Sequence, residues 1–133
     1  MNPSTRWITL AAALFGFLGV ALGAFGAHAL KATLLANGQL DSWKTAVFYQ
    51  LVHAVALLAL AGWRDSHGGP NTKVAFCWTV GVILFSGSLY WLALGGPIKL
   101  LWPVTPLGGL ALLAGWGMLI FAAWKRPGTK SSP

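Results

Sequence analysis

Four long apolar segments, none of which contains an aspartate or a glutamate, constrain this chain more than any other feature. They are residues 7–30, 45–63, 74–94 and 104–124. Each is close to the ~20 residues that a helix needs to cross the hydrocarbon core of a bilayer. Lipid offers the backbone no hydrogen-bond partners, so all four are expected to be helices. The sequence therefore predicts one all-α transmembrane domain, residues 1–133, folded as an integral membrane four-helix bundle.

The composition agrees with a membrane protein. Of the 133 residues, 56% are apolar and 8% are charged, whereas soluble domains carry roughly 25% charged residues. Eight tryptophans fit two aromatic belts at the membrane surfaces. The formal charge of +7 comes from basic residues scattered between the spans, without the interleaved stacking aromatics of single-strand binders. We therefore expect membrane lipids, and no nucleic acid, as partners.

The basic residues predict how the chain is oriented. With four spans, both termini share one side with the second connection, and that side carries six basic residues: Arg6, Arg64, Lys73, Lys125, Arg126 and Lys130. The opposite side carries three, Lys31, Lys44 and Lys99. Basic residues favour the cytoplasmic side of a membrane. The sequence thus predicts a multi-pass inner-membrane protein with both termini cytoplasmic.

Glycines recur at helical spacing in the first and fourth spans. They are Gly16, Gly19, Gly23 and Gly26 in the first, and Gly108 and Gly115 in the fourth. Each set lies on one helix face, and small residues let the backbones of membrane helices approach closely. We expect these glycines to pack helices and predict that the two glycine seams meet each other. The alternative is that both seams face lipid or a second copy of the chain.

The second span carries the most polar helix face. Tyr49, Gln50 and His53 lie three or four residues apart, on one side of a helix. His53 is expected roughly 12 Å along its span at ~1.5 Å per residue, where an unpaired imidazole is costly. We therefore expect it to have a hydrogen-bond partner. The candidates are Ser86, Ser88, Tyr90 and a backbone carbonyl.

A ligand site is the alternative interpretation of the same polar residues. His28, near the end of the first span, would join His53 around a metal, a haem or a quinone head group. Lys31 would snorkel to the interface or bind a lipid phosphate. The candidate ligand-binding residues are therefore His28, Lys31, Tyr49, Gln50, His53, Ser86, Ser88 and Tyr90. The sequence identifies neither a cofactor nor a metal, and no set of residues suggests catalysis.

The segments between and within the spans carry further signals. Residues 30–35 predict a brief interfacial helix, and residues 98–101 form an apolar piece that would lie in the interface or dip back into the protein. Thr105 is expected to cap the fourth span. Residues 86–90 predict a local kink or the polar lining of a small cavity, and residues 68–71 a solvated turn.

Four ordered motifs resemble a known family. They are GAFGAHAL at residues 23–30, AVFYQ at 46–50 followed by His53, FSGSLY at 85–90, and TPLGG at 105–109. Together they are similar to the YgdD family of small bacterial inner-membrane proteins, whose relatives are described as transmembrane protein 256, and the similarity covers nearly the whole chain. The resemblance implies four membrane helices. It implies no activity and no catalytic residues.

Two hypotheses of function follow from the sequence. The first is a non-enzymatic accessory, assembly or structural component, present as a homo-oligomer or in a larger membrane complex, because the chain has glycine seams and no catalytic set. The second is a binding or transport module for a small lipophilic or redox ligand around His28 and His53.

Overall fold

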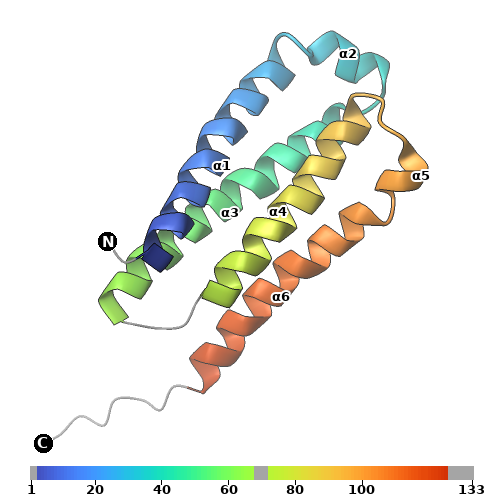
Figure 1. Ribbon diagram of the computed structural model, residues 1–133. Coiled ribbons are helices and arrows are strands. Elements are labelled where there is room, and N and C mark those ends of the chain that lie inside the picture. The colour runs from blue at the N-terminus through green and yellow to red at the C-terminus, as the bar shows by residue number, and fades with distance from the viewer. Residues whose placement is uncertain (1–2, 68–71, 126–133) are drawn as a thin grey trace, which may run out of the picture.

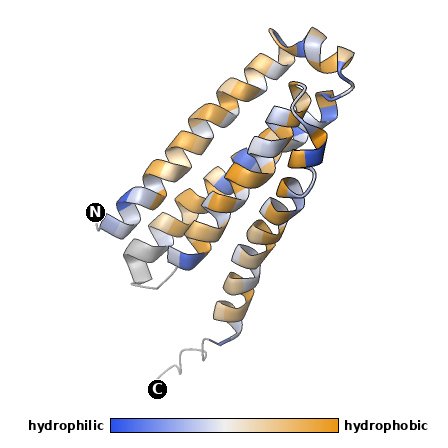
Figure 2. Ribbon diagram, turned by 45° about the vertical axis from the view of Figure 1, so that its right-hand side comes forward, coloured by the Kyte–Doolittle hydropathy of each residue, from blue (hydrophilic) through white to orange (hydrophobic). Residues whose placement is uncertain are grey.

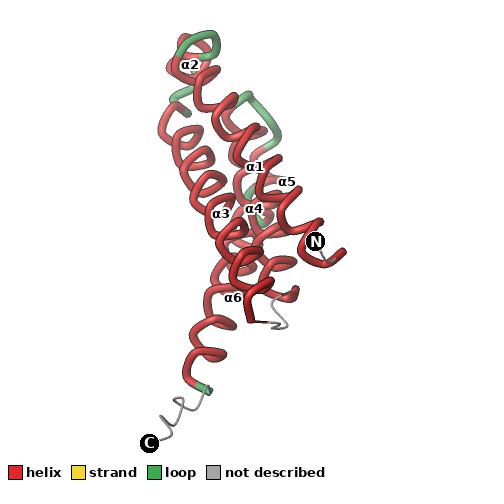
Figure 3. Tube along the Cα trace, turned by 90° about the vertical axis from the view of Figure 1, so that its left-hand side faces the viewer, coloured by secondary structure: helices red, strands yellow, loops and turns green. Residues whose placement is uncertain are grey.

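Six helices form the described part of the protein in the computed structural model, which covers residues 3–67 and 72–125. They are α1 (Pro3–Ala27), α2 (Lys31–Ala36), α3 (Leu40–His67), α4 (Thr72–Ala93), α5 (Ile98–Leu101) and α6 (Val104–Trp124). No strand occurs within these residues. Between them, loops are confined to the ends of the helices (Figure 3).

Four helical segments are long and apolar enough to cross a membrane. They are Pro3–Ala27, Leu40–Trp63, Thr72–Ala93 and Ile98–Trp124, the last of which joins α5 to α6. Hydrophobic residues predominate along the outer helices α1 and α6 (Figure 2). The prediction of an all-α membrane protein with four spanning helices is therefore confirmed.

The long helices stand side by side in chain order, α1, α3, α4 and α6 (Figure 1). The principal packing is α1 on α3, α3 on α4 and α4 on α6, with a minor contact between α1 and α4. The short helices α2 and α5 lie towards the same end of the bundle, opposite the end where α1 begins and α6 finishes (Figure 1). The chain therefore repeats one pattern twice: long helix, short helix, long helix.

Two glycines with positive φ close helices at the end that holds α2 and α5. Gly38 has φ 64° and Gly95 has φ 93°. In the first turn, Gly38 N donates to Leu35 O at 3.0 Å and Gln39 N to Leu34 O at 2.9 Å. Gly95 and the following residue make the equivalent two bonds after α4. This is the Schellman arrangement, in which a left-handed glycine satisfies the last helical carbonyls and reverses the chain.

The core is divided between the two ends of the bundle. The larger cluster joins α1, α3, α4 and α6 and includes Ile8, Leu57, Trp78 and Leu112. The smaller one, at the α2 end, contains Leu34, which is completely buried. Asn37 secures this end because its Nδ2 donates to Ala93 O at 3.0 Å.

The two glycine seams do not meet, so that prediction is wrong. The seam of α1 faces α3: a Cβ at Gly19 would overlap Leu51, and one at Gly26 would overlap the indole of Trp43. The seam of α6 instead faces α4, where a Cβ at Gly108 would overlap backbone atoms of Phe85. Each seam is occupied by the long helix that is its neighbour along the chain, and α1 and α6 stand at opposite edges of the row (Figure 1).

The remaining predicted glycines differ in their surroundings. A Cβ at Gly115 would overlap Trp78, and one at Gly23 would lie 3.4 Å from Val47 Cγ1. A Cβ at Gly16 would have no neighbouring atom within 4 Å. Gly16 therefore makes no close helix contact within the described protein, although the spacing grouped it with the other three glycines of α1.

Several local expectations also change. α1 ends at Ala27, three residues earlier than expected, so His28 lies in a turn. α3 begins at Leu40, five residues before the predicted span, and continues to His67. α4 is a continuous helix through residues 86–90. Residues 30–35 correspond largely to α2, and residues 98–101 to α5. The turn predicted at residues 68–71 lies outside the described residues.

Candidate functional site

Gln50 joins three helices from a buried position on α3. Its Nε2 donates to Phe15 O of α1 at 2.9 Å, and its Oε1 accepts the hydroxyl of Tyr90, on α4, at 2.9 Å. The side chain is 4% exposed, so it has little access to solvent or lipid. In a dry interior an amide needs such partners, because an unpaired polar group there is expensive.

Two serines of α4 extend this set of bonds to α3 and α6. Ser86 Oγ donates to Ala46 O of α3 at 2.8 Å. Ser88 Oγ and Thr105 Oγ1 are hydrogen-bonded at 2.6 Å, which joins α4 to α6. Thr105 does not cap α6 as predicted: the N-cap position is Pro103, without a side-chain cap bond. The threonine hydroxyl is directed across the helix pair to Ser88.

His53 has a partner on each ring nitrogen. Nδ1 lies 2.8 Å from Tyr49 O, one turn earlier on α3, and Nε2 lies 3.1 Å from Nε1 of Trp116 on α6. An indole N–H can only donate, so Nε2 must accept, and Nδ1 then carries the proton that the carbonyl accepts. The hydrogen-bond pattern thus assigns a neutral imidazole in the Nδ1–H tautomer.

Aromatic rings surround this histidine. Tyr49 lies nearly parallel to it, with ring centroids 6.3 Å apart, and Trp78 and Trp116 approach it edge-on at 5.9 Å and 6.1 Å. A cavity of about 370 Å³ between α3, α4 and α6 is lined in part by Tyr49, His53 and Trp116. The Nε1 of Trp78 is buried and has no hydrogen-bond partner among the described residues.

Sequence reasoning missed Trp116. Of the partners expected for His53, the structure provides a backbone carbonyl, whereas Ser86, Ser88 and Tyr90 bond elsewhere. The missing signal was the indole N–H, a donor-only group within an apolar span. In the sequence this tryptophan resembles the many that mark a membrane interface.

The structure does not bring His28 to His53. α1 and α3 are antiparallel, with Gly26 opposite Trp43 and Gly19 opposite Leu51. His28 is therefore near the level of the start of α3, and His53 lies ten residues beyond Trp43. At ~1.5 Å per residue this separates the two histidines by at least ~15 Å along the helix axis.

The described residues also fit poorly with a metal or haem at His53. They contain no group of three or more His, Cys, Asp or Glu side chains placed to hold a metal ion. Both nitrogens of His53 are engaged, so coordination through Nε2 would break the bond from Trp116. Lys31 also lies apart from the polar network and lines a different cavity with Lys44.

The fold and the hydrogen-bond network define the class of protein: a small integral membrane protein with four spanning helices, whose polar side chains within the spans form hydrogen bonds between helices. The chain belongs to the family described as "Protein of unknown function (DUF423)", which matches residues 22–109. The resemblance found in the sequence motifs is confirmed by the relatives of this family.

The relatives are named membrane proteins from several bacteria. The chain is 39% identical over 125 residues to UPF0382 inner membrane protein YgdD of Escherichia coli K12, covering 90% of this chain and 91% of the relative. It is 39% identical to UPF0382 membrane protein YwdK of Bacillus subtilis 168, covering 85% and 92%. It is 41% identical to a UPF0382 membrane protein of Haemophilus influenzae, covering 90% and 94%.

No solved structure matches the chain. The names of the relatives and the four apolar helices together confirm a multi-pass inner-membrane protein.

Proposed function

We propose that this protein is a non-enzymatic membrane component that works by associating laterally, through α1 and α6, with copies of itself or with a larger membrane complex. The observation that carries the proposal is how little of the two outer helices is buried. Within the most apolar stretch of each span, 22% of the α1 residues and 17% of the Ile98–Trp124 residues are buried, against 39% in the α3 and the α4 span.

The polar groups inside the spans support a structural role for the bundle. Gln50, Ser86 and His53 use their hydrogen-bonding atoms on backbone or side-chain partners of the same protein. Bonds of this kind hold membrane helices together, where the apolar surfaces of lipid and protein are nearly equivalent. Within this network neither Ser86 nor Ser88 is bonded to a histidine or a carboxylate.

Open glycines on the two outer helices support lateral association. A Cβ at Gly16 on α1, which is half-buried, or at Gly117 on α6, which is exposed, would have no atom within 4 Å apart from its chain neighbours and the backbone of its own helix. Small residues on a lipid-facing helix surface let a second helix approach closely and gain packing contacts. Val20 and Leu113, each four residues from the open glycine of its helix, are exposed and extend these faces.

Cysteine cross-linking in intact membranes tests this function. In a Cys77→Ala background, Gly16→Cys or Gly117→Cys should yield a discrete covalent product with a thiol-to-thiol or thiol-to-amine reagent. Gly87→Cys is the matched control, because Gly87 is equally open but lies on the inner helix α4. Equal cross-linking at all three positions, or a strictly monomeric, partner-free particle after gentle solubilisation, would contradict the proposal.

A second candidate function is binding or transport of a small lipophilic or redox molecule beside His53. The cavity of about 370 Å³ supports it, since Tyr49 and His53 place polar atoms beside an otherwise apolar space. His28 has no part in this site. Mass spectrometry of extracted lipids and quinones, with metal analysis, would compare the wild type with His53→Ala. An unchanged set of bound molecules excludes the site.

The orientation is also part of the proposal. Both termini are assigned to the cytoplasm, because six basic residues fall on their side of the membrane and three on the other. The Lys31 and Lys44 end of the bundle then faces away from the cytoplasm.

A further inference from the structure

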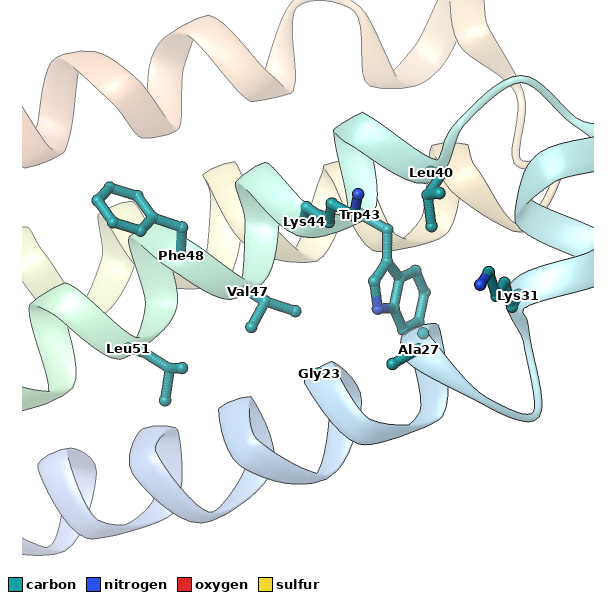
Figure 4. Close-up of a pocket in the computed structure, with 10 residues that line it drawn as sticks. Gly23, Ala27, Lys31, Leu40, Trp43, Lys44, Val47, Phe48 and Leu51 are labelled. Atoms are coloured by element: carbon teal, nitrogen blue, oxygen red, sulfur yellow. The ribbon is translucent and has the colours of Figure 1, made fainter.

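A second hollow lies at the opposite end of the α1–α3 pair from the large core cluster. Its volume is about 430 Å³, and it is bounded by the last turns of α1, the start of α2 and the first turns of α3. Figure 4 shows Lys31 at one end of this groove and Lys44 beside Trp43 near the start of α3, with Val47 and Leu51 following along α3. None of the hydrogen-bonded residues around Gln50 and His53 lines it.

The groove exists because the glycine seam is filled unevenly. Over Gly26 the indole of Trp43 takes the available space, and its Nε1 donates to Leu22 O at 2.9 Å. Over Gly23 the atom that a Cβ would approach most closely is Val47 Cγ1, at 3.4 Å, so the space there stays partly open. The floor and walls of this stretch are apolar along its length, as a hydrocarbon chain requires.

The mouth of the groove carries an excess of positive charge. Lys31 and Lys44 are both exposed. The neighbouring acid is Asp41, whose Oδ1 lies 3.9 Å from Lys44 Nζ while its own side chain is fully exposed. Exposed ion pairs of this kind are weak. The one carboxylate at this end is thus loosely paired with Lys44 alone, and the excess of positive charge suits this part of the groove to an anion.

The position of the mouth fits the membrane surface. Lys31 begins α2 shortly after α1 ends at Ala27, and Lys44 lies within the first two turns of α3, which begins at Leu40, so both lysines are near the ends of spanning helices. From Trp43 to Leu51 the groove follows eight residues of α3, about 12 Å at ~1.5 Å per residue. One leaflet of the hydrocarbon core is about 15 Å deep. The apolar part of the groove thus spans most of one leaflet.

We propose that this groove binds a phospholipid with an anionic head group. Lys31 and Lys44 hold the phosphate at the membrane surface, and one acyl chain lies over Gly23 between Val47 and Leu51. The two lysines match the anionic head group of such a lipid, and the apolar part of the groove, which is about as deep as one leaflet, matches its acyl chain. The site is independent of the lateral association proposed above.

Native mass spectrometry of the purified full chain tests the head-group half of this site. The probes are phosphatidylglycerol and phosphatidylcholine with identical acyl chains. Phosphatidylglycerol should be retained more strongly. Each of Lys31→Gln and Lys44→Gln should weaken its binding about fivefold, and the double variant roughly thirtyfold, if each lysine contributes as a surface cation does. Phosphatidylcholine also carries a phosphate, but its choline cation offsets that charge, so its weaker binding should fall by less than that of phosphatidylglycerol in these variants.

Lys99→Gln is the matched control, since Lys99 lies on the same side of the membrane but outside the groove. It should leave phosphatidylglycerol binding within twofold of the wild type. Equal retention of the two lipids, or equal losses from Lys99→Gln and from the groove lysines, overturns the proposal. Excess glycerol phosphate should fail to displace the lipid, and displacement by this chain-free head group would show that an anion alone is bound.

Filling the groove tests the acyl-chain half. Gly23→Leu places a side chain in the apolar part of the groove and should weaken the binding of phosphatidylglycerol although both lysines remain. Val20→Leu adds volume on an exposed surface of α1 and should not. Unchanged binding of phosphatidylglycerol in a folded Gly23→Leu variant would refute the proposal that an acyl chain lies in the groove. If that variant does not fold, the lysine variants still decide the site.

Discussion

At the scale of single residues, the polar side chains inside the membrane join one helix to the next. Gln50 is the clearest case, because one amide bonds a carbonyl of α1 and a hydroxyl of α4 from its position on α3. Hydrogen bonds between membrane helices average about 0.6 kcal/mol and reach about 1.7 kcal/mol. The stability of the helix row should therefore respond measurably to the loss of either partner.

A double-mutant cycle on Gln50 and Tyr90 isolates one of these bonds. Gln50→Met and Tyr90→Phe should each destabilise the protein by about 0.5–2 kcal/mol in detergent. The double variant should lose less free energy of unfolding than the sum of the two single losses, and the difference, the coupling energy between the two side chains, should be about 0.6 kcal/mol or more. Thermal or denaturant unfolding followed by tryptophan fluorescence measures all three variants. Strict additivity would mean that the two side chains do not interact.

At the scale of helices, glycines set how closely neighbours approach. α6 offers a direct comparison: a Cβ at Gly108 would overlap the backbone of Phe85, whereas one at Gly117 would meet no atom within 4 Å. A backbone cannot move aside as a flexible side chain can. The cost of a methyl group should therefore differ between these two positions of the same helix.

We predict that Gly108→Ala destabilises the protein by about 1–3 kcal/mol, the usual range for overpacking. Gly117→Ala should be neutral or slightly stabilising, since alanine favours a helix over glycine by about 1 kcal/mol. Unfolding in the same detergent compares the two variants. Equal stabilities would show that α4 and α6 are further apart than described.

The helix ends make a second prediction at this scale. Gly95 has φ 93°, and a side chain in the left-handed region costs about 1–2 kcal/mol. Gly95→Ala should lower the free energy of unfolding by about that amount. Gly87→Ala, at an open position within α4, is the control and should not lower it. If Gly95→Ala and Gly87→Ala have the same free energy of unfolding, the turn after α4 does not require a glycine.

At the scale of the whole molecule, the even number of spans places the start of α1 and the end of α6 at one end of the bundle (Figure 1). From the distribution of basic residues we propose that this end is cytoplasmic. Lys31, Lys44 and Lys99 then mark the opposite surface.

Reporter fusions check the orientation. A fluorescent protein fused after residue 133 should fluoresce, because it matures in the cytoplasm, and alkaline phosphatase at the same place should be inactive. Fusions truncated after residue 38, between α2 and α3, should give the reverse pattern. Activity of both reporters at one site would reveal two orientations of the chain.

The sequence predicted the four helices because length and apolar composition suffice for membrane spans. It did not predict the order in which the helices stand side by side. The spacing of Gly19 and Gly26 indicates that another helix packs against this face of α1, but it does not identify that helix. Nor did it separate His28 from His53, because the depth of each depends on where α1 ends and on the register of α3. Trp116 was missed because its indole is also what an interfacial belt would contain.

The chain-order row of helices has a consequence for biosynthesis. Each outer helix finds its principal partner within its own hairpin, α1 with α3 and α6 with α4. Helices that enter the membrane in the order of synthesis therefore complete each hairpin, with its tryptophan-over-glycine contact, as soon as the second long helix arrives. The hydrogen bonds from Ser86 to Ala46 and from Tyr90 to Gln50 then join the α1–α3 hairpin to the α4–α6 hairpin, each of which has already formed.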